Sequence, residues 1–179
     1  AFPGEKEPVT VGNFARAVGA FERTLVTPSR FDAFVKGDQT AFTEPQKKGL
    51  KTFIETGCIT CHSSAYMGGQ MYQKFGVIEP YWKYTKSEEI DKGRYVITNN
   101  ESDKYIFKVP LLRNVEKTAP YFHDGSVTQL QEAVWIMGRI QLGKDLIKPQ
   151  LEDITAFLKS LTGEIPENGI KVPLLPSME

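Results

Sequence analysis

The only two cysteines of the chain, Cys58 and Cys61, stand three positions apart and are followed directly by His62. A disulfide between them would close too short a loop to stabilise a fold, so we expect the two thiols to serve chemistry. At this spacing two thiols can add across the two vinyl groups of one porphyrin, which leaves the adjacent histidine under the iron. The motif therefore predicts one covalently attached haem c, with Cys58 and Cys61 as thioethers and His62 as an iron ligand.

A structural zinc site and a redox dithiol are the two other interpretations of these residues. A structural zinc ion takes four nitrogen or sulfur ligands, and the whole chain offers only two cysteines and two histidines, the second being His123. Cys61 and His62 are adjacent, which disfavours joint ligation of one tetrahedral ion. A redox dithiol is typical of a thioredoxin-like βαβ context, which the sequence lacks. Haem c is the interpretation that we adopt.

The sixth iron ligand decides between electron transfer, which favours a closed coordination shell, and chemistry at an open iron. Its candidates are the second histidine and the four methionines: Met67, Met71, Met137, Met178 and His123. Met67 and Met71 follow the haem motif closely, and Met178 lies in the tail. Met137 falls on the inner face of an expected helix, which would hold its sulfur rigidly, although a lone helical methionine is more often a core residue. His123 stands in a turn that could also present a ligand, so the residues alone leave both open.

Apolar residues at helical spacing indicate helices near residues 10–25, 31–35, 43–56, 128–142 and 149–161. The spacing of Thr43 to Gln46, and of Thr128 to Gln131, resembles a capping box and marks two of the helix starts. Gly57 and Gly143 mark the corresponding ends, so that the haem motif follows directly on a helix. No β pattern of any length is visible, and we expect an all-α fold.

Residues 63–127 show little regular pattern but are rich in aromatic side chains: Tyr66, Tyr72, Phe75, Tyr81, Trp82, Tyr84, Tyr95, Tyr105 and Phe107. A compact domain seldom holds about 60 residues without regular structure unless another group organises them. A haem would do so, because its large apolar faces replace a missing core. We therefore expect long irregular loops wrapped round the haem.

The composition excludes several function classes. Lys and Arg together number 22, as do Asp and Glu, so the formal charge is zero and no anionic partner such as nucleic acid or a membrane surface is indicated. No apolar run approaches the ~20 residues that cross a bilayer. The chain shows no signal peptide at Ala1, so we expect either a mature product or a cytosolic chain.

The sequence resembles the bacterial di-haem cytochrome c peroxidases in a series of segments: residues 12–28 with 31–32, 57–62, 107–114, 118–126 and 133–143. The segments occur in the family's order and cover nearly the whole chain. The resemblance is to the C-terminal half of the family, which holds a high-potential haem with histidine and methionine ligands. Met137 matches the family's methionine, and this argues against the relatives that oxidise a partner protein, which have tyrosine there.

The resemblance also implies roles for residues outside the haem motif. Carbonyl oxygens at the positions of Thr118 and Pro120 bind calcium in the family, so calcium is an expected second cofactor. His123 would be a residue of the haem pocket and not an iron ligand. Arg113 would pair with a haem propionate, the alternative being an ordinary surface arginine.

One part of the family pattern is missing. The family has a second CxxCH in an N-terminal domain, whose low-potential haem opens a coordination position to hydrogen peroxide, and this chain has no second motif. Residues 1–4 resemble the family's junction region, so we expect a truncated or proteolysed enzyme that is inactive without the N-terminal haem domain. One alternative is a free-standing mono-haem cytochrome that only carries electrons. Another is that His123 or an open coordination site makes this haem itself catalytic.

The predicted architecture is an all-α, cytochrome c-like domain over residues 43–163. We expect a helical extension, residues 1–42, to pack on it, and an irregular tail, residues 164–179, to follow. Attachment of haem c takes place outside the bacterial cytoplasm, so the resemblance implies a periplasmic protein. It further implies a small electron donor, a cytochrome c or a cupredoxin, with hydrogen peroxide reduced to water at the absent haem; a homodimer is an additional expectation.

Overall fold

The computed structural model describes residues 2–172 of the chain, and Met178 lies outside them. The chain divides into two compact units, Ser29–Gly163 and a smaller one formed by the residues up to Pro28 together with those from Glu164 onward. The larger unit includes residues 29–42, which the sequence analysis assigned to the extension; the predicted domain boundaries and the packing of the extension stay predictions. None of the helices among the described residues is both long enough and apolar enough to cross a membrane.

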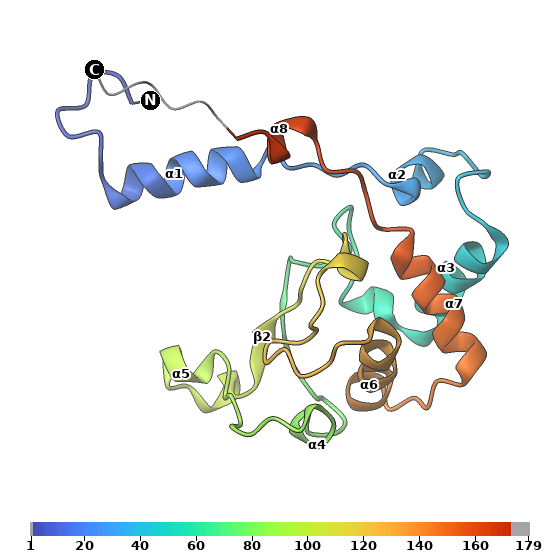
Figure 1. The fold of residues 1–179 in the computed structure, drawn as a ribbon. Helices are drawn as coiled ribbons and strands as arrows, with labels where there is room; N and C mark the ends of the chain where they lie inside the picture. The colour runs from blue at the N-terminus through green and yellow to red at the C-terminus, as the bar shows by residue number, and fades with distance from the viewer. Residues whose placement is uncertain (1, 173–179) are drawn as a thin grey trace. The chain divides into compact units, whose positions relative to one another are not determined.

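The larger unit is mostly helical (Figure 1). Its helices are α2 (Arg30–Val35), α3 (Glu44–Thr56), α4 (Trp82–Thr85), α5 (Tyr95–Thr98), α6 (Leu130–Leu142) and α7 (Lys148–Lys159), with 3-10 turns η1 (Cys58–Thr60), η2 (Glu101–Asp103) and η3 (Val115–Lys117). The predicted ranges of the long helices are confirmed to within a few residues, and the long stretch between α3 and α6 contains only short elements.

A small antiparallel sheet corrects the all-α prediction. Strands β1 (Tyr72–Lys74) and β2 (Ile106–Lys108) pair with Tyr72 opposite Lys108. Each strand is three residues long, which is too short to produce a visible alternation of apolar and polar residues. The pairing joins segments more than thirty positions apart in sequence, so no local pattern could have revealed it.

The helix α3 begins and ends where the sequence predicts. The backbone N–H of Thr43 donates to Gln46 Oε1 at 3.0 Å at its start, and Gly57 at its end has a φ of +100°, which favours glycine. Gly143 closes α6 in the same way, with a φ of +60°. The capping box predicted at Thr128 is wrong, because α6 begins at Leu130 with Gln129 as its N-cap and without a side-chain capping bond.

Two clusters of buried side chains form the core of the larger unit. The helix-packed cluster lies mainly between α3 and α7 and consists of Phe42, Phe53, Met67, Leu146, Ile154, Phe157, Leu158 and Leu161. The aromatic cluster lies under the loops and α6 and consists of Tyr81, Tyr121, Val127, Ala133, Ile136 and Ile140, with half-buried rings such as Phe75 and Phe107 packed against it. The helix α6 contributes to both, since Val134 packs against the helix-packed cluster.

The close approach of α3 to α7 depends on one glycine. A Cβ atom at Gly49 would lie 1.9 Å from the carbonyl oxygen of Asp153 on α7. Only a residue without a side chain fits there, and the two helices can therefore bury Phe53 and Phe157 between them, with ring centroids 5.2 Å apart.

The smaller unit contains α1 (Val11–Glu22) and α8 (Glu167–Ile170). Thr10 caps α1 by accepting a hydrogen bond from the backbone N–H of Asn13 at 3.1 Å, as expected for threonine at a helix start. The apolar face of α1 is largely exposed, with Phe14 71% accessible to solvent.

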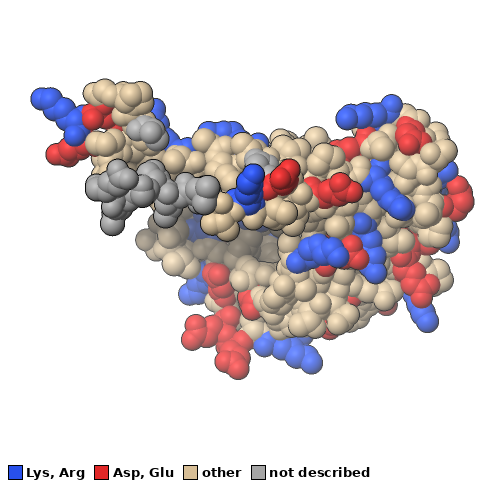
Figure 2. All heavy atoms as spheres, turned by 45° about the horizontal axis from the view of Figure 1, so that its top comes forward, with Lys and Arg blue, Asp and Glu red and all other residues tan. Residues whose placement is uncertain are grey.

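The charged side chains of the molecule are mixed in sign. Figure 2 shows Lys and Arg interspersed with Asp and Glu over the visible face, in agreement with the formal charge of zero. No broad patch of one sign covers this face.

Candidate functional site

The C-terminal end of α3 places the two cysteines. The left-handed turn at Gly57 leads directly into η1, which begins at Cys58. Both Cys58 and Cys61 are free and half-buried, and the hydroxyl of Thr56 lies 3.4 Å from the sulfur of Cys58. Burial raises the pKa of the Cys58 thiol.

The ring of His62 is half-buried and oriented by the backbone. Its Nδ1 lies 3.3 Å from the carbonyl oxygen of Met67, and a Cβ atom at Gly68 would come within 3.1 Å of the same nitrogen. Burial lowers the pKa of His62, which favours the neutral ring. A neutral ring that donates from Nδ1 keeps the lone pair of Nε2 for a metal.

The chemistry of these donors fits a haem c. Both thiols are free and stand at the CxxC sequence spacing, and the next residue is a histidine whose Nδ1 lies 3.3 Å from a backbone carbonyl oxygen. A backbone hydrogen bond to the far nitrogen is typical of a metal-bound histidine. Within residues 2–172, no group of three or more His, Cys, Asp or Glu side chains is arranged to hold a bare metal ion.

The methionine candidates lie in different surroundings. Met67 is 2% exposed within the helix-packed cluster, and its carbonyl faces the Nδ1 side of His62. Met71 is 39% exposed. Met137 is half-buried on α6, one turn after Ala133 and Val134 and therefore on their side of the helix.

The face of α6 that carries Met137 borders both clusters. Val134 packs against the helix-packed cluster, whereas Ala133 belongs to the aromatic cluster. His62 lies beside the helix-packed cluster, since its ring centroid is 6.5 Å from that of Phe53. Ligation of iron by Met137 remains a prediction, and its position between the clusters is compatible with it.

His123 lies among aromatic rings. It stacks on Phe107 with centroids 4.3 Å apart and meets the edges of Tyr81 and Phe75 at 5.1 and 5.8 Å. Its neighbour Asp124 accepts hydrogen bonds from the Ser87 hydroxyl and the Ser126 backbone N–H, and these keep the pKa of the Asp124 carboxyl low despite its burial. His123 is thus packed against the aromatic cluster, and its role as a haem-pocket residue stays a prediction.

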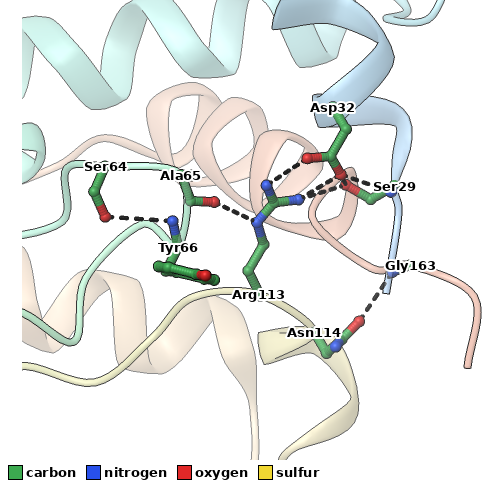
Figure 3. Close-up of polar contacts among 8 residues, drawn as sticks. All are labelled: Ser29, Asp32, Ser64, Ala65, Tyr66, Arg113, Asn114 and Gly163. Atoms are coloured by element: carbon green, nitrogen blue, oxygen red, sulfur yellow. Dashed lines mark hydrogen bonds and ion pairs between the residues drawn. The ribbon is translucent and has the colours of Figure 1, made fainter. Parts of the chain in front are cut away.

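Arg113 takes part in an ion pair that the sequence analysis did not foresee (Figure 3). Its two Nη atoms each lie 2.7 Å from an oxygen of Asp32, and Nη1 also donates to the Ser29 hydroxyl at 2.9 Å. The hydrogen bond from Arg113 holds the pKa of the Asp32 carboxyl well below its usual range. Propionate binding by Arg113 stays a prediction; in this structure its guanidinium group is engaged with Asp32.

Asp32 and Ser29 are the residues that sequence reasoning missed at this site. A signal for them existed, because Ser29 and Asp32 have the spacing of a capping box and begin α2 as one. Nothing in the sequence links this box to Arg113, which is 81 positions further along the chain.

The predicted calcium ligands lie on the surface. Thr118 and Pro120 are exposed and flank Ala119, whose bond to Pro120 is cis. Thr118 donates its hydroxyl hydrogen to the carbonyl oxygen of Val115 at 3.2 Å. Calcium binding through backbone carbonyls at these two positions stays a prediction.

Cys58, Cys61 and His62 fit the CxxCH motif of c-type haem proteins, and comparisons with known proteins agree with that class. No family model matches the chain. The chain is 48% identical to the Cytochrome c551 peroxidase of Pseudomonas aeruginosa, over 99% of its own length and 51% of that protein. It is 44% identical to the Cytochrome c551 peroxidase of Nitrosomonas europaea, over 95% and 49% of the two chains. The chain is 43% identical to the Cytochrome c peroxidase Ccp of Escherichia coli, over 84% of its own length and 32% of that protein.

Solved structures show the same fold. A MauG-like protein associated with microbial copper homeostasis matches 91% of this chain and 56% of its own, at a TM-score of 0.75 and 26% identity. The diheme peroxidase BthA of Burkholderia thailandensis matches 83% and 50% at a TM-score of 0.57, where 18% identity supports the fold alone. The chain is homologous over nearly its whole length to the bacterial di-haem cytochrome c peroxidases, and it spans about half the length of the first two relatives.

Proposed function

We propose that this chain is the C-terminal, electron-accepting haem domain of a bacterial cytochrome c peroxidase. In this proposal Cys58 and Cys61 hold the haem, and His62 and Met137 bind its iron. Electrons arrive from a small redox protein, a cytochrome c or a cupredoxin, and hydrogen peroxide is reduced to water at a second haem that this chain does not carry. The homology to cytochrome c peroxidases over 99% of the chain supports the assignment.

The observation that carries the electron-transfer role is the position of Met137. It is half-buried on α6, on the side of the helix where the helix-packed cluster meets the aromatic cluster. A helix of 13 residues that packs on both clusters can present a thioether with little freedom of movement. A haem with histidine and methionine ligands supplies reversible one-electron chemistry at a raised reduction potential.

The protein's own groups define what happens at this site. His62 is held neutral by burial and is oriented by the Met67 carbonyl. Rings of the aromatic cluster, Phe75, Phe107 and His123 among them, would cover the apolar faces of the group and exclude water. If His62 and Met137 both bind the iron as proposed, they would leave it no open site for peroxide, and the haem would serve electron transfer.

The setting of the protein follows from the same proposal. Covalent haem attachment implies the periplasm, where a soluble donor protein can dock. Calcium held by the carbonyls of Thr118 and Pro120 belongs to the proposal as well. We also infer that the chain alone turns over hydrogen peroxide negligibly, which a peroxidase assay of the isolated haem-loaded chain measures directly.

The Met137 assignment is tested by absorption spectroscopy of the oxidised, haem-loaded protein. We expect a far-red sulfur-to-iron charge-transfer band that Met137→Ala abolishes. Met71→Ala is the matched control, because Met71 is a surface methionine close to the haem motif, and it should leave the band unchanged. A band that survives Met137→Ala would show that another residue binds the iron.

A further inference from the structure

The ion pair of Arg113 with Asp32 has the geometry of a fixed clamp (Figure 3). The guanidinium group meets both carboxylate oxygens at 2.7 Å, and its carbon lies 4.9 Å from the centre of the Phe31 ring. The Arg113 side chain is only 14% exposed. The Asp32 side chain is 32% exposed. A bidentate, half-buried pair of this kind restricts its partners more than a flexible surface pair does.

The clamp reaches the loop that follows the haem motif. Arg113 Nε donates to the carbonyl oxygen of Ala65 at 2.8 Å, and Ala65 lies between His62 and Met67 in the sequence. Ser64 and Met67 have φ angles of +73° and +54°, in the left-handed region that non-glycine residues seldom occupy. Such conformations persist only where the surroundings determine them strongly, and the bond from Arg113 is one such determinant.

The same stretch of chain also lies at the two backbone groups that contact His62, which are those of Met67 and Pro110. The backbone N–H of Leu112, the neighbour of Arg113, donates to the carbonyl oxygen of Met67 at 3.2 Å. This carbonyl oxygen is the one that lies 3.3 Å from His62 Nδ1. Leu112 and Arg113 thus donate hydrogen bonds to two carbonyl oxygens of the loop, those of Met67 and Ala65. The Met67 carbonyl also contacts His62.

We propose that Asp32 and Arg113 are positioning residues for His62: the clamp fixes the loop whose Met67 carbonyl accepts the Nδ1 hydrogen, and thereby tunes the histidine as an iron ligand. This inference rests on the proposed haem attachment at His62. A strong hydrogen bond from Nδ1 makes the imidazole a better electron donor to iron and so stabilises the oxidised state. A weaker bond raises the reduction potential.

The first test is the reduction potential of the haem-loaded protein. Asp32→Asn and Arg113→Lys should shift the ratio of oxidised to reduced haem at a fixed potential by about two- to tenfold toward reduced, since the change acts through the second shell of the ligand. Asp32→Glu, which keeps the carboxylate, should shift this ratio less than Asp32→Asn does.

Asp153→Asn is the matched control for this measurement. It removes the same charge and breaks another 2.7 Å ion pair between elements, that of Lys48 on α3 with Asp153 on α7. Any shift seen in Asp153→Asn is the through-space effect of the lost charge and is subtracted. Equal shifts in Asp32→Asn and Asp153→Asn would overturn the proposal.

The second test observes the iron–histidine bond itself. In a Met137→Ala background the reduced iron lacks the proposed methionine, and resonance Raman spectroscopy reports the iron–histidine stretch. We expect Asp32→Asn to lower its frequency and Asp153→Asn to leave it unchanged. If thermal unfolding shows that the clamp variants are destabilised while potential and frequency stay as in the parent, the clamp is structural only and the inference fails.

The two proposals fail in distinguishable ways. A parent protein without the far-red band disproves Met137 ligation, yet the dependence of the iron–histidine frequency on Asp32 can still be measured. A band that is present, together with a frequency that ignores Asp32, disproves the clamp and leaves the Met137 assignment in place.

Discussion

The helix-packed and aromatic clusters are built on different principles. Around the helix-packed cluster, α3 and α7 have 13 and 12 residues, and their backbone groups are satisfied within the helices. Around the aromatic cluster the elements other than α6 are three or four residues long. Distant bonds hold them together: Gly76 N–H to Gln141 Oε1 at 3.0 Å, and the Tyr81 hydroxyl to the carbonyl of Asp91 at 2.9 Å.

If haem is attached as proposed, the difference predicts which part of the fold depends on it. Helices that bury an apolar face against each other stabilise themselves through local hydrogen bonds and packing. Short segments joined by side-chain bonds have few such resources, so their order depends on what the rings pack against. We therefore expect the helix-packed region to fold with or without haem, and the aromatic region to need it.

The largest effect in this comparison is expected from Phe157→Ala. Phe157 is fully buried and its ring meets those of Phe42 and Phe53, so truncation should cost about 3–5 kcal/mol of unfolding free energy. Urea unfolding of the haem-loaded protein measures it. Phe75→Ala, a truncation of a half-buried ring in the aromatic region, should cost less. Equal losses at Phe157 and Phe75 would mean that the two regions do not differ in packing.

A smaller effect, more specific to the comparison, is expected when haem attachment is prevented. In a Cys58→Ser, Cys61→Ser double variant, amide hydrogen exchange in β1 and β2 should become about 100-fold faster. Without the haem, local opening of these strands breaks no contacts with it and therefore costs less free energy. The amides in the middle of α3 and α7 should change little. Thr60→Ser, which keeps both thiols, is the control. Equal acceleration in all four elements would show that the regions unfold as one.

The smallest effect concerns one hydroxyl in each region. Tyr81→Phe removes a bond between segments ten positions apart and should cost about 1 kcal/mol. Ser160→Ala removes a bond from the hydroxyl of Ser160, the C-cap of α7, to the carbonyl of Phe157. It should cost under about 0.5 kcal/mol, because that carbonyl still accepts a hydrogen bond from the Ser160 backbone N–H. Thermal unfolding of both variants measures the two losses of unfolding free energy. A larger loss in Ser160→Ala than in Tyr81→Phe would contradict the expected order.

Much of the helical framework was predictable from sequence because its signals are local. The box of Thr43 with Gln46, the stop at Gly57 and the stop at Gly143 each lie within one turn of the helix they define. The box at Thr128 failed, since the chain at Gln129 is still extended and the helix begins one residue later. The sheet of β1 and β2 was missed because its pairing is long-range.

Haem attachment at the CxxCH motif could be predicted from the sequence, because Cys58, Cys61 and His62 lie within five consecutive positions of the chain. Only the tertiary structure decided what surrounds that motif. His123 packs on Phe107, and the face of α6 that carries Met137 lies beside both clusters. Arg113 forms an ion pair with Asp32. The physical reason is that a covalent motif depends on neighbours along the chain, whereas a hydrogen bond or a ring contact depends on distance in space.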